Sequence, residues 1–169
     1  LFSLMRTLQN ARKIVIMGHR GPDGDALGAA LGWAEYLQGL GKSAIVVMPN
    51  PFPDFLRWLP NSEKVIFYDH KRDVARHLIE GTDLICMLDF NSLHRLQEMG
   101  DVVANSKAER LMIDHHLSPD TTCAQTIISH PEMSSTSELV FRLIYQLGGY
   151  ETMTTQGASA LYCGMMTDT

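Results

Sequence analysis

Apolar runs alternate with helical patterns along most of the chain. Short runs rich in Ile, Val, Leu and Met predict buried strands, and apolar residues spaced three and four apart predict helices. The strands are expected at 14–17, 44–48, 64–68, 84–88, 110–113 and 125–129. The helices are expected at 25–40, at 73–80, from the capping sequence Ser135-Thr136-Ser137-Glu138 to Gly148, and at 154–166.

This alternation predicts an α/β domain whose largely parallel sheet is flanked by helices on both faces. In such sheets, ligands bind beyond the carboxyl ends of the strands. The 169 residues contain 45% apolar residues, enough to fill the core of one domain. No linker or internal repeat divides the sequence.

The charge balance narrows the classes of partner. The formal net charge is -5, with 14 Lys and Arg against 19 Asp and Glu. No Lys/Arg cluster is longer than two residues, which argues against long duplex nucleic acid because such binding neutralises many phosphates. A small phosphorylated ligand held by metal ions remains compatible with this charge. No apolar run reaches membrane-spanning length, and three cysteines without a CxxC pair favour a cytoplasmic protein with reduced thiols.

Acidic and imidazole side chains follow the apolar segments at four separate points. Because the carboxyl ends of parallel strands share one edge of a sheet, we expect these side chains to converge there. Carboxylate and imidazole ligands without thiolate suit divalent ions such as Mn²⁺ or Mg²⁺. The residues are His19, Asp23 and Asp25 after the first strand, Asp89 after the strand 84–88, Asp114, His115 and His116 after the strand 110–113, and Asp168 after the last helix.

Each piece alone has a simpler interpretation. An Asp-Gly-Asp sequence is usually a turn, a His pair is usually structural or solvated, and Asp89 alone could cap a helix. Their combination, in order and at strand ends, predicts a metal site. Two such ions can share a water, lower its pKa and bind both the attacking and the leaving oxygens of a phosphoryl transfer.

The motifs His19-x-x-x-Asp23-x-Asp25, Asp89, Asp114-His115-His116 and Asp168 resemble the four motifs of the DHH phosphoesterase superfamily, in the family's order. Arg95 and the stretch 134–139 are most similar to the oligoribonuclease branch, which also hydrolyses 3'-phosphoadenosine 5'-phosphate. The resemblance implies that residues 1–169 are a DHH catalytic domain that stops after the fourth metal motif. The C-terminal substrate-binding domain expected of such enzymes is absent from the sequence.

The resemblance also implies a role for each residue. One ion is expected on His19, Asp23 and Asp89, and the other on Asp25, Asp89, His115 and Asp168, with Asp89 bridging. His116 is expected to face the phosphate, and Asp114 to orient a histidine or complete the site behind the ligands. Arg95 would contact phosphate or support Asp89. The expected cofactors are two divalent ions, Mn²⁺ first, with Mg²⁺ or Co²⁺ as alternatives.

The expected function is that of a metal-dependent phosphoesterase. It would hydrolyse short oligoribonucleotides or nucleotide phosphates, such as pApA or 3'-phosphoadenosine 5'-phosphate, by attack of a metal-bridging hydroxide on phosphorus. An inorganic pyrophosphatase or exopolyphosphatase of the same superfamily is one alternative, and a non-catalytic metal- or nucleotide-sensing module is another. The Pro-rich segment 49–60 is expected to cross the surface. Alternatively, Met48, Phe52, Phe55 and Trp58 would make a homodimer contact or stack a base.

Overall fold

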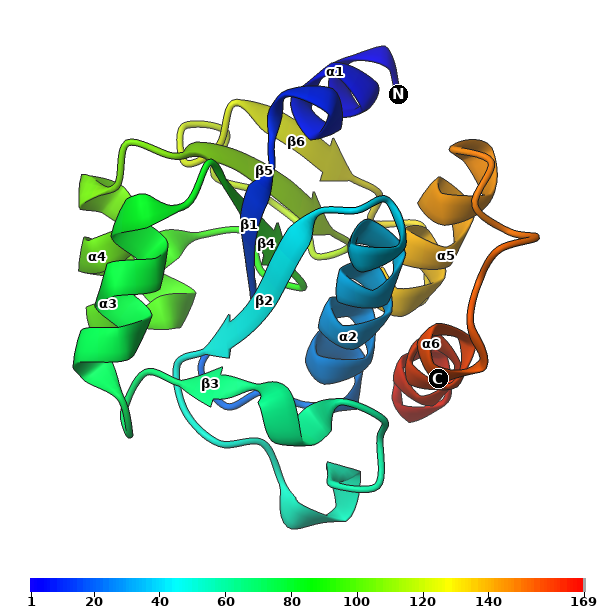
Figure 1. Ribbon diagram of the computed structural model, residues 1–169, viewed down its shortest axis with the longest axis horizontal. Helices are drawn as coiled ribbons and strands as arrows, with labels where there is room; N and C mark the ends of the chain where they lie inside the picture. The colour runs from blue at the N-terminus through cyan, green and yellow to red at the C-terminus, as the bar shows by residue number, and fades with distance from the viewer. Residues whose placement is uncertain (169) are drawn as a thin grey trace.

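The computed structural model describes residues 1–168 as a six-stranded sheet between two layers of helices (Figure 1). The strand order is β3-β2-β1-β4-β5-β6, and every neighbouring pair is parallel. The predicted α/β fold is therefore confirmed. The strands are β1 (Lys13–Met17), β2 (Ser43–Met48), β3 (Ile66–Phe67), β4 (Leu84–Leu88), β5 (Glu109–Asp114) and β6 (Thr126–Ser129).

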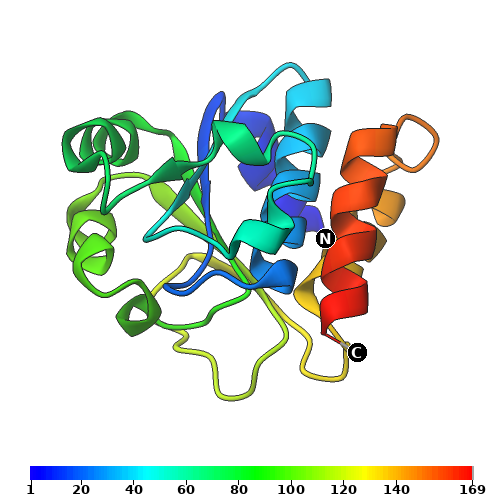
Figure 2. The same ribbon diagram turned by 90° about the horizontal axis from the view of Figure 1, so that it is seen from below.

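Helices cover both faces of the sheet, as Figures 1 and 2 show. One face packs against α2 (Gly24–Gly39), α5 (Thr136–Gln146) and α6 (Thr155–Thr167), and the other against α3 (Arg72–Gly81) and α4 (Glu98–Asn105). Helix α1 (Phe2–Asn10) buries Leu4 and Leu8 in the same core as α2. Within residues 1–168, no helix has the length and apolar character needed to cross a membrane. Three short 3₁₀ helices are η1 (Asp54–Leu56), η2 (Ser62–Lys64) and η3 (Leu93–Leu96).

Successive side chains of each strand enter opposite cores. In β1, Ile14 and Ile16 join the core under α2, whereas Val15 and Met17 join the core under α3 and α4. This is the period of two expected for a strand. Both faces of the sheet are apolar because both are covered, as is usual for parallel sheets.

The direction of the strand order reverses between β1 and β4. From β1 the chain passes outward through β2 and β3, then returns to place β4 on the other side of β1. Loops that leave two such neighbouring strands diverge and open a crevice at their carboxyl ends. The loop after β1 contains His19, Asp23 and Asp25, and Asp89 directly follows β4. The topology therefore brings the first two motifs together.

The strand expected at 64–68 is a two-residue strand preceded by a 3₁₀ turn. The amides of Lys64 and Val65 donate to the carbonyls of Asn61 and Ser62, at 3.1 and 3.3 Å. These amides are consequently not available to the sheet. The sequence pattern also misses two of the helices, α1 and α4.

Candidate metal centre

The first group of potential ligands surrounds His19 in the loop after β1. Its Nε2 lies 3.7 Å from Oδ1 of Asp23 and 3.4 Å from Oδ2 of Asp89. The other ring nitrogen, Nδ1, lies 2.9 Å from the carbonyl oxygen of Arg20. Because a carbonyl only accepts, Nδ1 carries the hydrogen, and the Nε2 lone pair is left for a ligand. These three side chains could hold one divalent ion.

The second group surrounds His115 at the end of β5. Its Nε2 lies 3.6 Å from Oδ2 of Asp25, 3.5 Å from Oδ1 of Asp89 and 3.4 Å from Oδ2 of Asp168. Its Nδ1 lies 3.2 Å from the carbonyl oxygen of Met133, so this ring is oriented as His19 is. Helix α6 ends just before Asp168 and delivers that carboxylate from the outer layer. Asp25, His115 and Asp168 could hold a second ion, with Oδ1 of Asp89 directed at the same histidine nitrogen.

The distances within both groups fit an ion between the side chains. They exceed the N···O distance of a direct hydrogen bond, about 2.7–3.2 Å. Two donor atoms that each lie about 2.0–2.2 Å from one ion are roughly 3.0–3.6 Å apart at ordinary bond angles. The distances of 3.4–3.7 Å in the two groups lie at or just beyond the upper end of this second range. The oxygen and imidazole donors are also the types that Mn²⁺ accepts.

The two oxygens of Asp89 face different histidines. Oδ2 is directed at His19 and Oδ1 at His115, which is the geometry of a carboxylate that bridges two ions. The residue is 2% exposed and adopts a φ of 67°, a left-handed conformation that Asp tolerates better than most residues. Its amide donates to the Ile113 carbonyl at 3.0 Å, and its Oδ1 accepts from the hydroxyl of Thr136 at 3.0 Å. Both the backbone and the side chain of Asp89 are therefore fixed by a hydrogen bond.

The first turn of α5 forms hydrogen bonds with the candidate metal centre. Asp25 accepts from the amides of Thr136, at 2.9 Å, and Ser137, at 2.8 Å, which lie in the first turn of α5. First-turn amides have no partner inside the helix, so a carboxylate there is stabilised by them and by the helix dipole. Ser135 caps the helix by accepting from the Glu138 amide, as the capping sequence predicts. The contributions of Thr136 and Ser137 were not foreseen from the sequence, although its hydroxyl-rich run before an apolar helix is a visible signal.

Asp114 and His116 form a direct pair. Nδ1 of His116 lies 2.7 Å from Oδ1 of Asp114, and the His116 amide donates to Oδ2 at 3.0 Å. Asp114 is fully buried, whereas the His116 side chain is 42% exposed. Nε2 of His116 is therefore the ring nitrogen that remains free for a ligand. His115 and His116 are adjacent in sequence but differ in their surroundings. Nε2 of His115 faces three carboxylates, whereas His116 is fixed through Nδ1 by Asp114.

Burial and mutual charge shift the ionisation of these groups. Burial and the nearby Asp89 raise the pKa of Asp25 to about 7. Burial opposes ionisation of Asp89, but His115 and His19 lower its pKa below the usual range. Asp89 raises the pKa of His115 to about 9. Burial alone would lower the pKa of His19, yet Asp23 and Asp89 raise it to about 10. The close carboxylates raise the pKa of both histidines because they favour positive charge nearby. A bound cation would be stabilised by the same negative charge.

Arg95 lies in η3, at the exposed margin of the centre. Its carbonyl accepts from the Arg20 amide at 2.7 Å, which ties η3 to the loop after β1. Among residues 1–168, the partners recorded for the Asp89 carboxylate are Thr136 and the histidines at 19, 115 and 116. Contact with phosphate is the role that we retain for Arg95 as a proposal. A third possible ligand group joins Asp89, His115 and His116. The remaining histidines, His70, His77, His94 and His130, are exposed and belong to none of these groups.

Residues 13–165 match the model of the DHH family, N-terminal domain. The bifunctional oligoribonuclease and PAP phosphatase NrnA of Thermus thermophilus is 31% identical over 156 residues, which cover 92% of this chain and 43% of the relative. A probable manganese-dependent inorganic pyrophosphatase of Streptococcus mutans is 26% identical over 164 residues, covering 93% of this chain and 48% of the relative.

Among solved structures, an exopolyphosphatase-related protein from Bacteroides fragilis superposes with a TM-score of 0.96 and 47% sequence identity. The match covers 99% of this chain and 49% of that one. This chain thus spans less than half the length of each of these three proteins. The family match extends over most of the sequence and includes the loop after β1, Asp89 and the Asp114-His115-His116 motif. The chain therefore belongs to the DHH family of phosphoesterases, as its N-terminal domain.

Proposed function

We propose that this chain is the catalytic domain of a two-metal phosphodiesterase or phosphatase that works with Mn²⁺. The observation that carries the proposal is the Asp89 carboxylate, whose two oxygens face His19 and His115 separately. His19, Asp23 and Asp89 would hold one ion, and Asp25, Asp89, His115 and Asp168 the other. The manganese-dependent relative supports the choice of metal.

When bound, the two ions would supply Lewis-acid activation of water and neutralise charge on the phosphoryl oxygens. The protein's own contribution is to fix the positions of the ligands. The carbonyls of Arg20 and Met133 accept from Nδ1–H of His19 and His115, so Nε2 is the nitrogen that would lose its proton to bind an ion. Preformed ligand geometry of this kind lowers the reorganisation needed during the reaction.

His116 would act on the substrate directly. In the doubly protonated ring, Nε2 would donate a hydrogen bond to a phosphoryl oxygen, or a proton to the leaving oxygen. Asp114 fixes the orientation of the ring through the 2.7 Å contact with Nδ1. Arg95, at the exposed margin, would add a cation for the phosphate.

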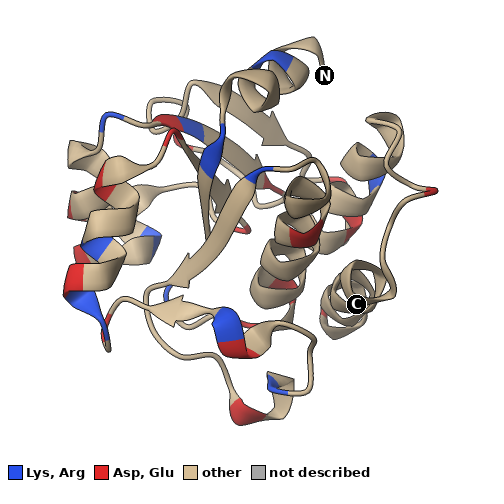
Figure 3. Cartoon of the chain, in the orientation of Figure 1, with Lys and Arg blue, Asp and Glu red and all other residues tan. Residues whose placement is uncertain are grey.

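Short oligoribonucleotides and nucleotide phosphates are the substrates that we favour. The relative named as an oligoribonuclease and PAP phosphatase supports this class. In Figure 3, Lys and Arg are dispersed over separate elements and do not form a continuous stripe. Together with the net charge of -5, this dispersion favours a short substrate held at the centre over a long nucleic acid held along a groove.

Pyrophosphate or polyphosphate is the second candidate substrate. The 47% identical structure is named as exopolyphosphatase-related, and a pyrophosphatase is among the relatives. The same metal centre would serve either class because both reactions break a bond at phosphorus. The difference lies in what surrounds the phosphate.

A side-by-side hydrolysis assay of the full-length protein with added Mn²⁺ tests both candidates. The substrates are pApA, 3'-phosphoadenosine 5'-phosphate and pyrophosphate. Preference for either nucleotide supports the favoured class, and preference for pyrophosphate replaces it with the second. Bound Mn²⁺ without turnover of any of the three would contradict the catalytic proposal and indicate a sensing module.

A further inference from the structure

Two large aromatic side chains on the segment 51–60 are directed into solvent. Of the four residues predicted for a surface contact, Met48 and Phe52 are buried in the core, so the prediction is wrong for these two. Phe55 is 67% exposed and Trp58 is 64% exposed, whereas Leu56 and Leu59 are each 1% exposed. The segment begins as the 3₁₀ helix η1, in which residues three apart lie above one another. The two leucines therefore form the buried side of this turn, and the two aromatic rings form an exposed side.

The exposed side is not needed to complete the fold. The leucines already supply the core contact, and Asp54 and Arg57 pair on the surface with Nε and Oδ1 3.1 Å apart. The proline residues of the segment, Pro51, Pro53 and Pro60, restrict φ and stiffen the backbone. An aromatic surface on a stiff support is preorganised for a ligand, because little conformational entropy is lost on binding.

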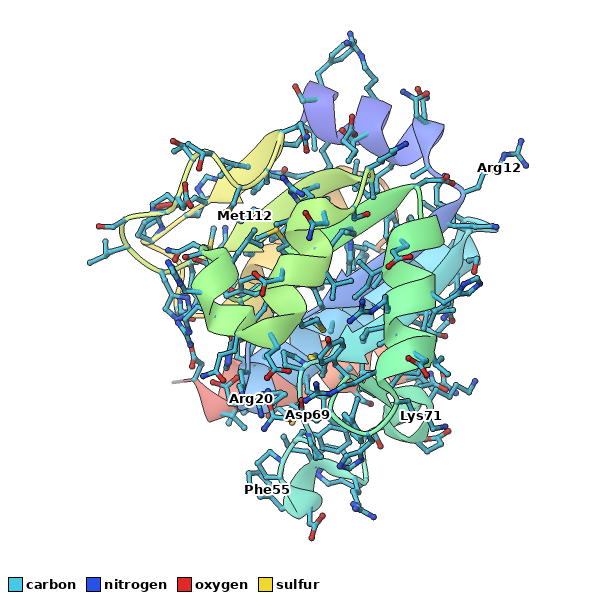
Figure 4. All side chains as sticks on the ribbon, turned by 90° about the vertical axis from the view of Figure 1, so that its left-hand side faces the viewer. Arg12, Arg20, Phe55, Asp69, Lys71 and Met112 are labelled. Atoms are coloured by element: carbon cyan, nitrogen blue, oxygen red, sulfur yellow. The ribbon has the colours of Figure 1, made fainter. Side chains whose placement is uncertain are left out.

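The segment leaves the sheet at the edge that carries the metal centre. It follows the carboxyl end of β2, and Oδ1 of Asn50 accepts from the Gly21 amide at 2.7 Å, two residues after His19. Phe55 is five residues from Asn50, which limits their separation to about 18 Å. In Figure 4, Phe55 lies at the same end of the molecule as Arg20, beyond the Arg20–Asp69 ion pair.

Resting on the function proposed above, we propose that Phe55 and Trp58 form a base-stacking site for a short oligoribonucleotide whose scissile phosphate lies at the metal centre. Every nucleobase has a flat π-face, so stacking on aromatic side chains tolerates any base sequence. A bare phosphate chain has no such face. The inference therefore selects nucleotides over pyrophosphate as the substrate class.

A second copy of this chain is a less suitable occupant. The two exposed rings offer roughly 300 Å² of aromatic surface. A stable protein interface needs about 800 Å² on each partner. A single stacked base, in contrast, is matched in size to one or two aromatic rings.

Steady-state kinetics of the full-length protein test the site. Phe55→Ala and Trp58→Ala should each raise KM for pApA by about fivefold or more, with a smaller effect on 3'-phosphoadenosine 5'-phosphate and none on any pyrophosphate turnover. Trp58→Phe keeps an aromatic face and should retain most of the affinity. Phe2→Ala is the matched control, because Phe2 is 76% exposed on α1 at the opposite end of the molecule (Figure 1).

Tryptophan fluorescence gives a readout that does not depend on turnover. Trp58 is exposed and Trp33 is fully buried, so a stacked base should quench Trp58 alone. Titration with pApA in the His116→Ala background should quench the emission, and the signal should disappear when Trp58→Phe is added. Ribose 5-phosphate, which has no base, should leave the emission unchanged.

The outcomes separate this inference from the function on which it rests. If the unaltered protein hydrolyses none of the substrates, the proposed function itself is contradicted. Hydrolysis of pApA with unchanged KM in both Ala variants, and no quenching of Trp58, overturns the stacking site alone. A change of oligomeric state in the Ala variants by light scattering, with unchanged KM, would assign the aromatic pair to a contact between two copies and also overturn it.

Discussion

The Thr136 hydroxyl donates a 3.0 Å hydrogen bond to Oδ1 of Asp89, the oxygen that also faces His115. Thr136 is the first residue of α5, and its amide donates a hydrogen bond to Oδ2 of Asp25. One residue of this helix therefore contacts two of the proposed metal ligands. The helix acts as a support that sets the position of both carboxylates, as groups behind the ligands commonly do in metal sites.

We predict that Thr136→Val lowers Mn²⁺ affinity or kcat by about 10- to 100-fold, because a nearly isosteric side chain can no longer donate to Asp89. Thr152→Val is the matched control, since within the described part of the chain the Thr152 hydroxyl donates only to the Gly149 carbonyl, in the loop that joins α5 to α6. Isothermal titration with Mn²⁺ and the hydrolysis assay together measure the effect. Equal behaviour of the two variants would refute a supporting role for Thr136.

The adjacent histidines should give different phenotypes. His115→Ala removes a proposed ligand and should abolish the increase in thermal stability that Mn²⁺ produces. His116→Ala should keep that increase while kcat falls by about 10²- to 10⁴-fold, because its proposed role is in proton donation. Differential scanning fluorimetry with and without Mn²⁺ separates the two. Loss of the Mn²⁺ effect in His116→Ala would show that this residue is a ligand instead.

Close packing of α2 on α6 should control the position of Asp168. A Cβ on Gly28 would meet the backbone of Ala160 and Gly164 in α6. Gly28→Ala should therefore destabilise the fold by about 1–3 kcal/mol and weaken Mn²⁺ binding by displacing α6.

A Cβ on Gly39, in the same helix, would meet no other part of residues 1–168 within 4 Å, apart from its chain neighbours and the nearby helix backbone. Gly39→Ala should stabilise the fold by about 0.4–1 kcal/mol and leave metal binding unchanged. Denaturant unfolding of both variants measures the contrast. If Gly28→Ala were as stable as Gly39→Ala, the close helix contact would not constrain the site.

Mn²⁺ affinity should increase as the pH rises from 6 to 9. In the metal-free protein the pKa of His19 is about 10 and that of His115 about 9, so both histidines are protonated at neutral pH. An ion must displace these protons, so each site should gain about tenfold in affinity per pH unit below its histidine pKa. Calorimetry in buffers of different ionisation enthalpy counts the protons released. Affinity that is independent of pH would mean that the histidines are not ligands.

The residues of the candidate site could be predicted from the sequence because their signals are local. Each lies within a few residues of a strand or helix end, and parallel strands bring those ends to one edge. The contact between Asp25 and the start of α5 joins residues 111 apart, and no local pattern encodes it. The role of Thr136 is hidden for the same reason.

The helices that the pattern misses are short, with nine residues in α1 and eight in α4. Helix α4 has eight residues, includes Gly100, and buries only one apolar stripe, with Met99, Val102 and Val103. Helix α1 buries Leu4 and Leu8 one turn apart, too few positions to establish a period. Both are stabilised by packing on the sheet more than by their own sequence.

The backbone conformation of Asp89 determines which substitution tests its role. Its φ of 67° means that Ala would add backbone strain to the loss of the carboxylate. Asn tolerates this conformation and keeps the size of the side chain, so Asp89→Asn removes the charge with less disturbance of the fold.

A Mn²⁺ titration followed by electron paramagnetic resonance tests the proposed two-metal site most directly. We expect two Mn²⁺ ions per chain, with spectra that show magnetic coupling between the two ions. In Asp89→Asn the coupling should disappear and activity should be lost while the fold persists. A single uncoupled ion in the unaltered protein, or an Asp89→Asn variant that remains coupled and active, would show that Asp89 does not join two ions.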